Sequence, residues 1–135
     1  MNPRKAVKSF IVNNNQLLLI KRADDDVHRP GIWEIPGGRL DKDENMIDGL
    51  VRETKEETNL DIEIIKELNK QHFIRDDGDP IDMTIFLCKP ISSKVCLSKE
   101  HSDFKWVNIN KAKENISHFF HKEVDLLLGT SDKID

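Results

Sequence analysis

The segment from Gly37 to Leu60 constrains the fold of this chain more than any other. It reads GGRLDKDENMIDGLVRETKEETNL, a glycine pair followed by an acidic loop and then by a run with helical periodicity. On a helical wheel, one apolar stripe is formed by Met46, Ile47, Leu50, Val51 and Thr54. The segment therefore predicts a loop with close backbone approach, followed by a helix that packs on a core and uses Asn45 as its N-cap.

The carboxylates of this helix lie beside the apolar stripe instead of opposite to it. Glu57 falls within the stripe, and Glu53 and Glu56 border it. Like charges three or four residues apart oppose each other by roughly 0.2–0.5 kcal/mol per pair, so this clustering needs compensation. A divalent cation would provide it, because Mg²⁺ takes one or two protein carboxylates together with phosphate oxygens. The alternative is a solvated acidic helix face.

The spacing of the charged residues resembles the Nudix box, GX5EX7REUXEEXGU, in which U is an aliphatic residue. Gly38 and Glu44 open the pattern, RETKEETNL closes it, and seven of its nine defined positions match. Thr54 stands where an aliphatic residue is usual, and Asn59 stands where glycine is usual. Both departures are mild, because Thr keeps a methyl group for packing and Asn tolerates the left-handed conformation at a helix end.

The resemblance implies an α/β protein with the Nudix α/β/α sandwich, a mixed sheet flanked by helices. It also implies bound Mg²⁺, with Mn²⁺ as a possible replacement, held by Glu53, Glu56, Glu57 and a backbone carbonyl of Gly38 or its neighbour Gly37. In many Nudix enzymes a Glu a few residues before a Trp reaches back to the metal site, and Glu100 matches that position. The resemblance therefore implies Glu100 as a fourth carboxylate at the metal; a loop Glu without a role is the alternative.

The candidates for the general base are Glu53, Glu56 and Glu100, because such a base must come within hydrogen-bonding distance of the attacking water. Glu44 precedes the expected helix and Arg52 lies two turns into it. We expect these two residues to form a buried ion pair that braces the loop. Arg22, at the end of an expected strand, could contact a substrate phosphate; a surface arginine is the alternative.

The resemblance implies a pyrophosphohydrolase with water as the nucleophile. The chain has no Tyr and therefore lacks the downstream Tyr associated with diadenosine polyphosphate hydrolases. It carries Arg75 where ADP-ribose pyrophosphatases typically have proline, so the markers of both substrate groups are missing. The segment GIWEIPGG is most similar to MutT-like members, which implies hydrolysis of a (deoxy)nucleoside triphosphate to a monophosphate and pyrophosphate. Open alternatives are ADP-ribose or another nucleotide sugar, and a non-catalytic nucleotide-binding regulator, although the retained box carboxylates favour an enzyme.

Length and composition bound the remaining possibilities. The 135 residues, with a net charge of −4, fit one domain covering 1–135 with a frayed tail at 130–135. No basic face suggests a nucleic-acid polymer, and no segment is apolar enough for a membrane span or signal peptide. We expect a cytoplasmic monomer or homodimer with reduced Cys88 and Cys96, whose partner is a small-molecule nucleotide.

The remaining segments predict a sheet and a second helical region. Asn13, Asn14 and Asn15 favour a tight turn between the first two strands. Expected strands cover residues 6–12, 16–21, 31–36, 62–68 with a continuation at 72–75, 81–88 and 94–97. A second helical region is expected at residues 111–129, with a possible break at 115–117. Asn115, His118 and His121 give no clean match to an oxidised-purine site, and the two histidines lack a third zinc ligand.

Overall fold

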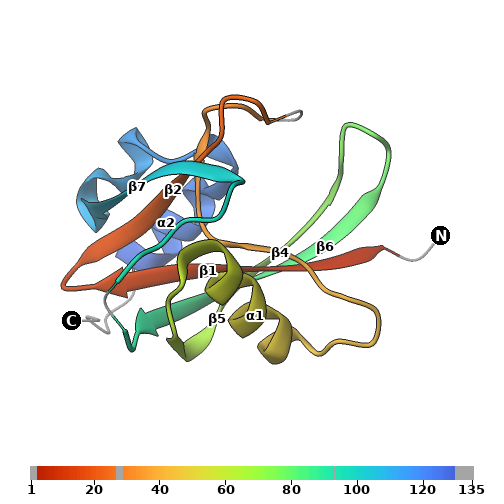
Figure 1. Ribbon diagram of the computed structural model, residues 1–135, viewed down its shortest axis with the longest axis horizontal. Helices are drawn as coiled ribbons and strands as arrows, with labels where there is room; N and C mark the ends of the chain where they lie inside the picture. The colour runs from red at the N-terminus through yellow and green to blue at the C-terminus, as the bar shows by residue number, and fades with distance from the viewer. Residues whose placement is uncertain (1–2, 27–28, 93, 130–135) are drawn as a thin grey trace.

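The protein is described by a computed structural model, which covers residues 3–26, 29–92 and 94–129. The expected tail at 130–135 lies outside the described residues. Within the described part, seven strands form one mixed sheet (Figure 1). The strands are β1 (Arg4–Asn13), β2 (Gln16–Arg22), β3 (Trp33–Glu34), β4 (Gly37–Arg39), β5 (Ile62–Ile74), β6 (Pro80–Pro90) and β7 (His101–Asn108).

Strand β1 lies at the centre of this sheet. One of its edges pairs in parallel with β6 from Arg4 to Ile11. Its other edge pairs antiparallel first with β4, from Ala6 to Lys8, and then with β2 at the hairpin, where Val12 faces Leu17. Strand β5 extends the sheet beyond β6, and β2 carries both β3 and β7. Along this second edge of β1 the sheet therefore splits, because β4 pairs with the first half of the strand and β2 pairs with its end.

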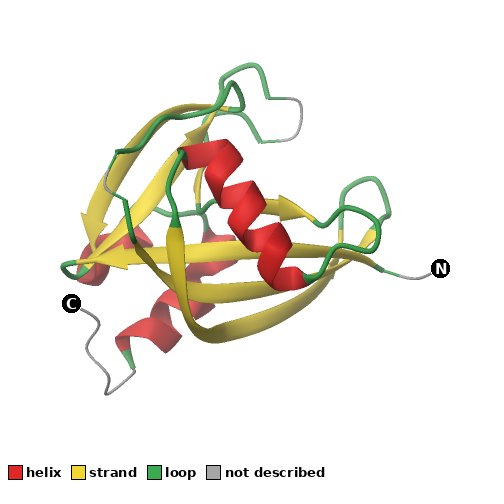
Figure 2. Ribbon diagram, turned by 60° about the horizontal axis from the view of Figure 1, so that its bottom comes forward, coloured by secondary structure: helices red, strands yellow, loops and turns green. Residues whose placement is uncertain are grey.

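Helices cover the two faces of the sheet (Figure 2). They are α1 (Met46–Thr58), the short 3₁₀ helices η1 (Ile109–Glu114) and η2 (His118–Phe120), and α2 (His121–Leu128). Asn45 caps α1 by accepting a hydrogen bond from the Asp48 backbone N–H, and Asn59 ends it in the left-handed conformation with φ of 67°. Both helix boundaries agree with the sequence.

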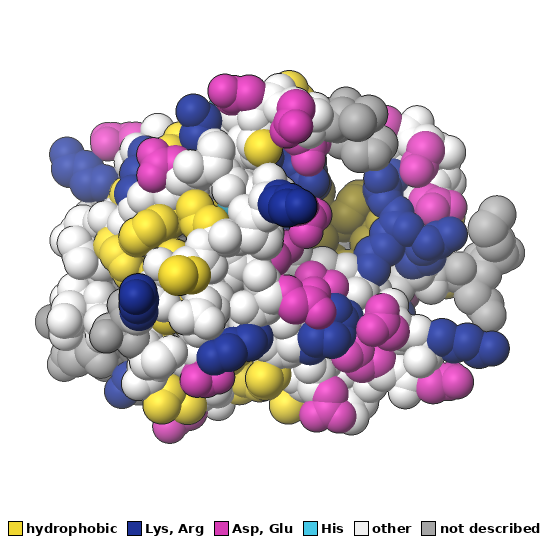
Figure 3. Space-filling model, viewed as in Figure 1, with side chains coloured by type: hydrophobic (Ala, Val, Ile, Leu, Met, Phe, Trp, Pro, Cys, Tyr) yellow, Lys and Arg dark blue, Asp and Glu magenta, His cyan; other side chains and the backbone are white. Residues whose placement is uncertain are grey.

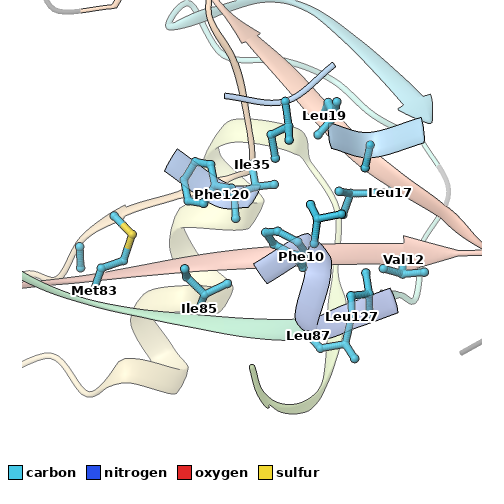
Figure 4. Close-up of a cluster of buried hydrophobic side chains, with 14 of the residues drawn as sticks. Phe10, Val12, Leu17, Leu19, Ile35, Met83, Ile85, Leu87, Phe120 and Leu127 are labelled. Carbon is cyan, nitrogen blue, oxygen red and sulfur yellow. The ribbon is translucent and has the colours of Figure 1, made fainter. Parts of the chain in front are cut away.

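Alternate residues of β1 enter two separate cores because successive side chains of a strand point to opposite faces. Phe10 and Val12 pack with Phe120 and Val124 in the core under α2, part of which appears in Figure 4. Val7 and Ile11 face the other way and pack with Leu50 in the core under α1. The helix–sheet–helix sandwich implied by the sequence is confirmed.

Three expectations about local structure were wrong in detail. Residues 94–97 form no strand, and the backbone N–H of Cys96 bonds to the Thr58 carbonyl beside the end of α1. The expected strand at 31–36 is reduced to β3 (Trp33–Glu34), and the glycine pair that follows it begins a further short strand, β4. Ile47 and Val51 are 47% and 39% exposed, so the apolar stripe of α1 is narrower than its periodicity suggested.

The second helical region is broken near residues 115–117 into η1, η2 and α2, as the sequence allowed. Ser117 caps η2 and accepts a hydrogen bond from the Phe119 N–H. None of the helices in the described part of the chain has the length and hydropathy that crossing a membrane requires.

Candidate functional site

A cavity of about 600 Å³ opens beside α1, between the glycine pair of β4, the loop before β7 and the hairpin of β5 and β6. That volume suits a ligand of nucleotide size. The face drawn in Figure 3 is hollowed, with acidic and basic side chains around the hollow and hydrophobic side chains inside it. The acidic residues lining the cavity include Glu53, Glu56, Glu57 and Glu100, so the structure brings all four predicted carboxylates to one place.

Glu57 is the deepest of the α1 carboxylates. It is 7% exposed, and its Oε1 accepts a hydrogen bond of 2.9 Å from the Gly37 backbone N–H. Burial raises the pKa of Glu57 to about 7, against the opposing effects of the Lys8 charge and the Gly37 hydrogen bond. Because burial disfavours the ionised form of Glu57, a cation bound beside it would stabilise that form.

Glu53 and Glu56 share a cation that comes from their own helix. Arg52 Nη1 lies 3.1 Å from Glu53 Oε1 and 3.2 Å from Glu56 Oε2. Burial raises the pKa of Glu53, with Arg52 opposing the shift. Gly38 packs closely against the same side chain, since a Cβ at this position would lie 2.7 Å from Glu53 Oε2. A side chain at position 38 would have to displace the Glu53 carboxylate, so glycine leaves room for this carboxylate beside the β4 backbone.

Arg52 also forms the predicted ion pair with Glu44. Its Nε and Nη2 lie 2.8 and 2.9 Å from the two oxygens of Glu44, a two-pronged contact between α1 and the preceding loop. The hydrogen bonds from Arg52 and from the Asp41 backbone lower the pKa of Glu44 to about 2. The expectation that this pair is buried was wrong, because the side chains of Arg52 and Glu44 are 28% and 14% exposed.

A buried cation and a buried carboxylate lie below the glycine pair. Lys8 is 5% exposed, and its Nζ donates to Glu34 Oε1 at 3.3 Å and to the carbonyls of Ile35 and Gly37 at 3.2 and 3.3 Å. Burial alone would raise the pKa of Glu34, but Lys8, His101 and Arg22 together hold it well below its usual range. The carboxylate clustering is therefore compensated by Lys8 and Arg52 before any metal is considered.

Arg22 lines the cavity, as the hypothesis of a phosphate contact requires. Its guanidinium is held by Asp26, through Nε at 3.0 Å and Nη2 at 2.7 Å, and by Glu34, through Nη1 at 2.8 Å. Burial lowers the pKa of Arg22, but the bond to Asp26 and the two nearby carboxylates outweigh burial and raise it. Arg29 lines the cavity too, so two arginines flank this end of it.

Glu100 lies in the turn before β7, and its side chain is exposed at the cavity wall. Its backbone carbonyl accepts a hydrogen bond of 2.9 Å from the Ala23 N–H, which ties this turn to the segment after β2. The next residue, His101, is 4% exposed and bonds through Nε2 to Glu34 Oε2 at 2.9 Å. Its Nδ1 is the one buried side-chain polar atom without a hydrogen-bond partner among the described residues.

The other end of the cavity is apolar. Phe73, Ile81 and Met83 on β5 and β6 line it together with Phe119, whose ring meets that of Phe73 edge to face at 4.9 Å between centroids. Arg75 and Asp76 stand at the hairpin beside this end. By contrast, the described residues lining the cavity do not include Asn115, His118 or His121.

The fit to a divalent cation can be tested on the donors themselves. In the described residues, no three acidic, histidine or cysteine side chains converge closely enough to hold a metal ion. The reason is visible in the contacts, because Arg52 draws Glu53 and Glu56 while Glu57 turns to Gly37. The donors are nevertheless hard oxygens beside a glycine backbone, the set that suits Mg²⁺ or Mn²⁺. These residues therefore fit such an ion once Arg52 releases its two carboxylates.

Sequence reasoning missed Lys8, Glu34 and His101 and the apolar end of the cavity. Lys8 interrupts the apolar run AVKSFIV, and Glu34 lies between apolar residues in IWEIP. A charged residue inside a buried strand indicates a buried partner. That signal was present, although it does not identify the partner.

Comparisons with known proteins agree with this architecture. A model of the NUDIX domain matches residues 2–127. Among curated proteins, the chain is 32% identical over 107 residues to a "MutT-like protein" of Streptomyces ambofaciens, covering 79% of this chain and 64% of that protein. It is 31% identical over 118 residues to "Nucleoside triphosphatase NudI" of Escherichia fergusonii, covering 79% and 83%. The chain thus spans slightly less than two thirds of the Streptomyces relative.

Among solved structures, the crystal structure of the MutT protein from Methanosarcina mazei Go1 superposes with a TM-score of 0.85. The match covers 97% of this chain and 98% of that one at 23% sequence identity. At this identity the likeness concerns the fold alone.

Proposed function

The chain belongs to the NUDIX family, and on that premise we propose that it hydrolyses a nucleoside diphosphate linked to another group, most simply a (deoxy)nucleoside triphosphate. The products would be the nucleoside monophosphate and pyrophosphate. The observation that carries this proposal is one cavity that joins four carboxylates to an apolar, aromatic end. A nucleotide needs both, because its phosphates require cations and its base requires apolar surface.

In this proposal Glu53, Glu56 and Glu57 hold Mg²⁺ or Mn²⁺ with a carbonyl of the glycine pair, and Glu100 approaches from the facing turn. Such an ion, when bound, neutralises charge on the phosphates and makes a coordinated water more acidic. Arg52 would then give up its contacts with Glu53 and Glu56 and keep its pair with Glu44. The two-pronged geometry of that pair keeps Arg52 in place during the exchange.

The reaction is attack of water on a phosphorus atom. A P–O bond forms to the water oxygen, the P–O bond to the leaving group breaks, and the proton of the water passes to a carboxylate. The candidates for this base are Glu53, Glu56 and Glu100, which all line the cavity. Glu57 is a weaker candidate, because it is buried and already accepts the Gly37 N–H.

The choice of a triphosphate rests on two supports. The relative from Escherichia fergusonii is described as a nucleoside triphosphatase, and the chain covers 83% of its length. Lys8, Arg22 and Arg29 supply positive charge at the carboxylate end of the cavity, where a chain of phosphates would lie. The base would then lie towards Phe73 and Phe119.

A nucleotide panel tests the proposal. The purified protein would be incubated with Mg²⁺ or Mn²⁺ and with ordinary and oxidised nucleoside triphosphates, ADP-ribose, NADH and diadenosine polyphosphates, and released monophosphate measured. We expect metal-dependent turnover with triphosphates ranked first and an alkaline optimum. Hydrolysis in ¹⁸O-labelled water identifies the phosphorus attacked. Tight binding of a nucleotide without turnover under either metal would replace the enzyme by a nucleotide-binding regulator.

A further inference from the structure

We propose that Glu34 is a positioning residue for this reaction, which holds two cations and the Glu100 turn in place around the phosphate end of the cavity. The inference rests on the proposed function. Glu34 itself is not among the described residues that line the cavity. Its side chain is 2% exposed and lies on β3, behind the cavity wall. Glu34 therefore affects the ligand site only through the residues that it contacts.

One carboxylate joins three separate segments of the chain. Oε1 of Glu34 lies 3.3 Å from Lys8 Nζ on β1. Oε2 lies 2.8 Å from Arg22 Nη1 at the end of β2 and 2.9 Å from His101 Nε2 at the start of β7. These contacts are charge-assisted, since Lys8 and Arg22 are cations and Glu34 is held ionised. No other carboxylate of the described residues bonds to all three of these side chains.

Each of the three partners of Glu34 is connected to the lining of the cavity. Lys8 and Arg22 line the cavity themselves. His101 does not need to reach the ligand, because it follows Glu100 directly and anchors the turn from which Glu100 extends. The backbone bond from Ala23 to Glu100 ties that same turn to the residue after Arg22. The three contacts of Glu34 thus set the separation between the phosphate-facing cations and the facing carboxylate.

The contacts of Lys8 show that Glu34 fixes where this cation lies and does not only balance its charge. Its ammonium group donates to Glu34, Ile35 and Gly37, and its charge also acts on Glu53 and Glu57. Without Glu34, the nearest compensating charges for Lys8 would be those carboxylates, which the proposed metal site requires. Glu34 therefore keeps Lys8 from occupying the place of the metal.

The variant Glu34→Gln tests this role, because it preserves shape and removes the charge that serves three donors. Glu123→Gln is the matched control. Glu123 is fully buried on α2, and among the described residues it accepts hydrogen bonds from the side-chain amides of Asn69 and Gln71 on β5. Both variants bury an amide in place of a carboxylate. Melting temperatures identify any general loss of stability, against which the other readouts are compared.

Two readouts separate positioning from stability. The first is kcat and KM with Mg²⁺, and we expect Glu34→Gln to lower kcat about tenfold or more and to raise KM. The second is calorimetric binding of α,β-methylene-dATP in EDTA, where we expect about tenfold weaker binding because Lys8 and Arg22 are displaced. Glu34→Asp, which retains charge but shortens the side chain, should recover part of the binding. If Glu34→Gln fails to fold, Glu34→Asp is compared with wild type instead, and a loss in both readouts is expected.

The outcomes are distinguishable. Turnover and EDTA binding within twofold of wild type in folded Glu34→Gln would overturn the inference and leave the proposed function standing. Equal losses in Glu123→Gln at the same melting temperature would also overturn it, since the effect would then be general. Glu34-dependent binding in EDTA by a protein that hydrolyses no nucleotide would reject the enzyme and retain the positioning role. A wild type that binds no probe in EDTA overturns the inference.

Discussion

Replacing Glu57 by glutamine should make the metal-free protein more stable at alkaline pH. Burial raises the pKa of Glu57 from 4.5 to about 7. In the unfolded chain the carboxyl group ionises near the lower value, so between these pH values the folded protein holds one more proton. The contribution of Glu57 to wild-type stability therefore falls as pH rises from about 4.5 to about 7 and is constant above that range.

The size of this effect follows from the two pKa values. At about 1.4 kcal/mol for each pH unit, ionised Glu57 costs the folded protein on the order of 3 kcal/mol above pH 7. Glutamine removes that cost and keeps an oxygen for the Gly37 N–H, although it loses the attraction of Lys8. We expect a net gain of roughly 1–3 kcal/mol, which for a chain of this size is roughly 4–10 °C in melting temperature.

The assay is thermal unfolding of wild type and Glu57→Gln in EDTA at pH 5 and pH 8.5. The gap between them should be small at pH 5 and large at pH 8.5. Glu56→Gln is the control, because the Glu56 side chain is 57% exposed and its replacement should change stability by about 0.5 kcal/mol or less. Added Mg²⁺ should raise the wild-type melting temperature and narrow the gap. A variant no more stable than wild type at pH 8.5, or a gap independent of pH, would refute the reasoning.

Two further variants address the frame around the carboxylates. Arg52→Ala should lower the melting temperature, because it leaves Glu44 without its ion-pair partner. Mn²⁺ affinity measured by EPR should stay equal or rise, since Glu53 and Glu56 lose a competing cation. A tenfold weaker Mn²⁺ affinity would contradict this expectation. Gly49→Ala should also destabilise despite a gain in helix propensity of about 1 kcal/mol, because the added Cβ would lie 2.1 Å from a methyl group of Leu40. A higher melting temperature would show that Leu40 moves aside freely.

Features of helix α1 that depend on neighbouring residues were predictable from the sequence. Asn45 and Asn59 bound α1 as expected, because capping depends on the side chain and backbone of a few neighbouring residues. The burial of Glu57 followed from its angular position, since the wheel placed it within the apolar stripe. Periodicity gave the centre of that stripe but not its width, which depends on how far the sheet extends below the helix. Ile47 and Val51 therefore remain partly exposed.

The charge network under the glycine pair was not predictable in the same way. Lys8, Glu34 and His101 are distant in sequence and meet because β1, β3 and the start of β7 converge. A single sequence shows that Lys8 needs a partner but not which acid provides it. Likewise, residues 94–97 carry strand-forming residues, yet the Cys96 backbone bonds to the end of α1 and the segment forms no strand.

Strand β1 is paired along both edges, by β6 on one side and by β4 and then β2 on the other. Its backbone amides can exchange with solvent only when the centre of the sheet opens, so residues 6–12 should be among the slowest to take up deuterium. The amides of the hairpin turn at 75–79 do not require the centre of the sheet to open, so they should exchange much faster. We therefore expect the cavity wall that carries Lys8 to be more rigid than the wall beside Arg75. Under the proposed function, the hairpin would then adjust to bases of different size while the spacing at the phosphates stays the same.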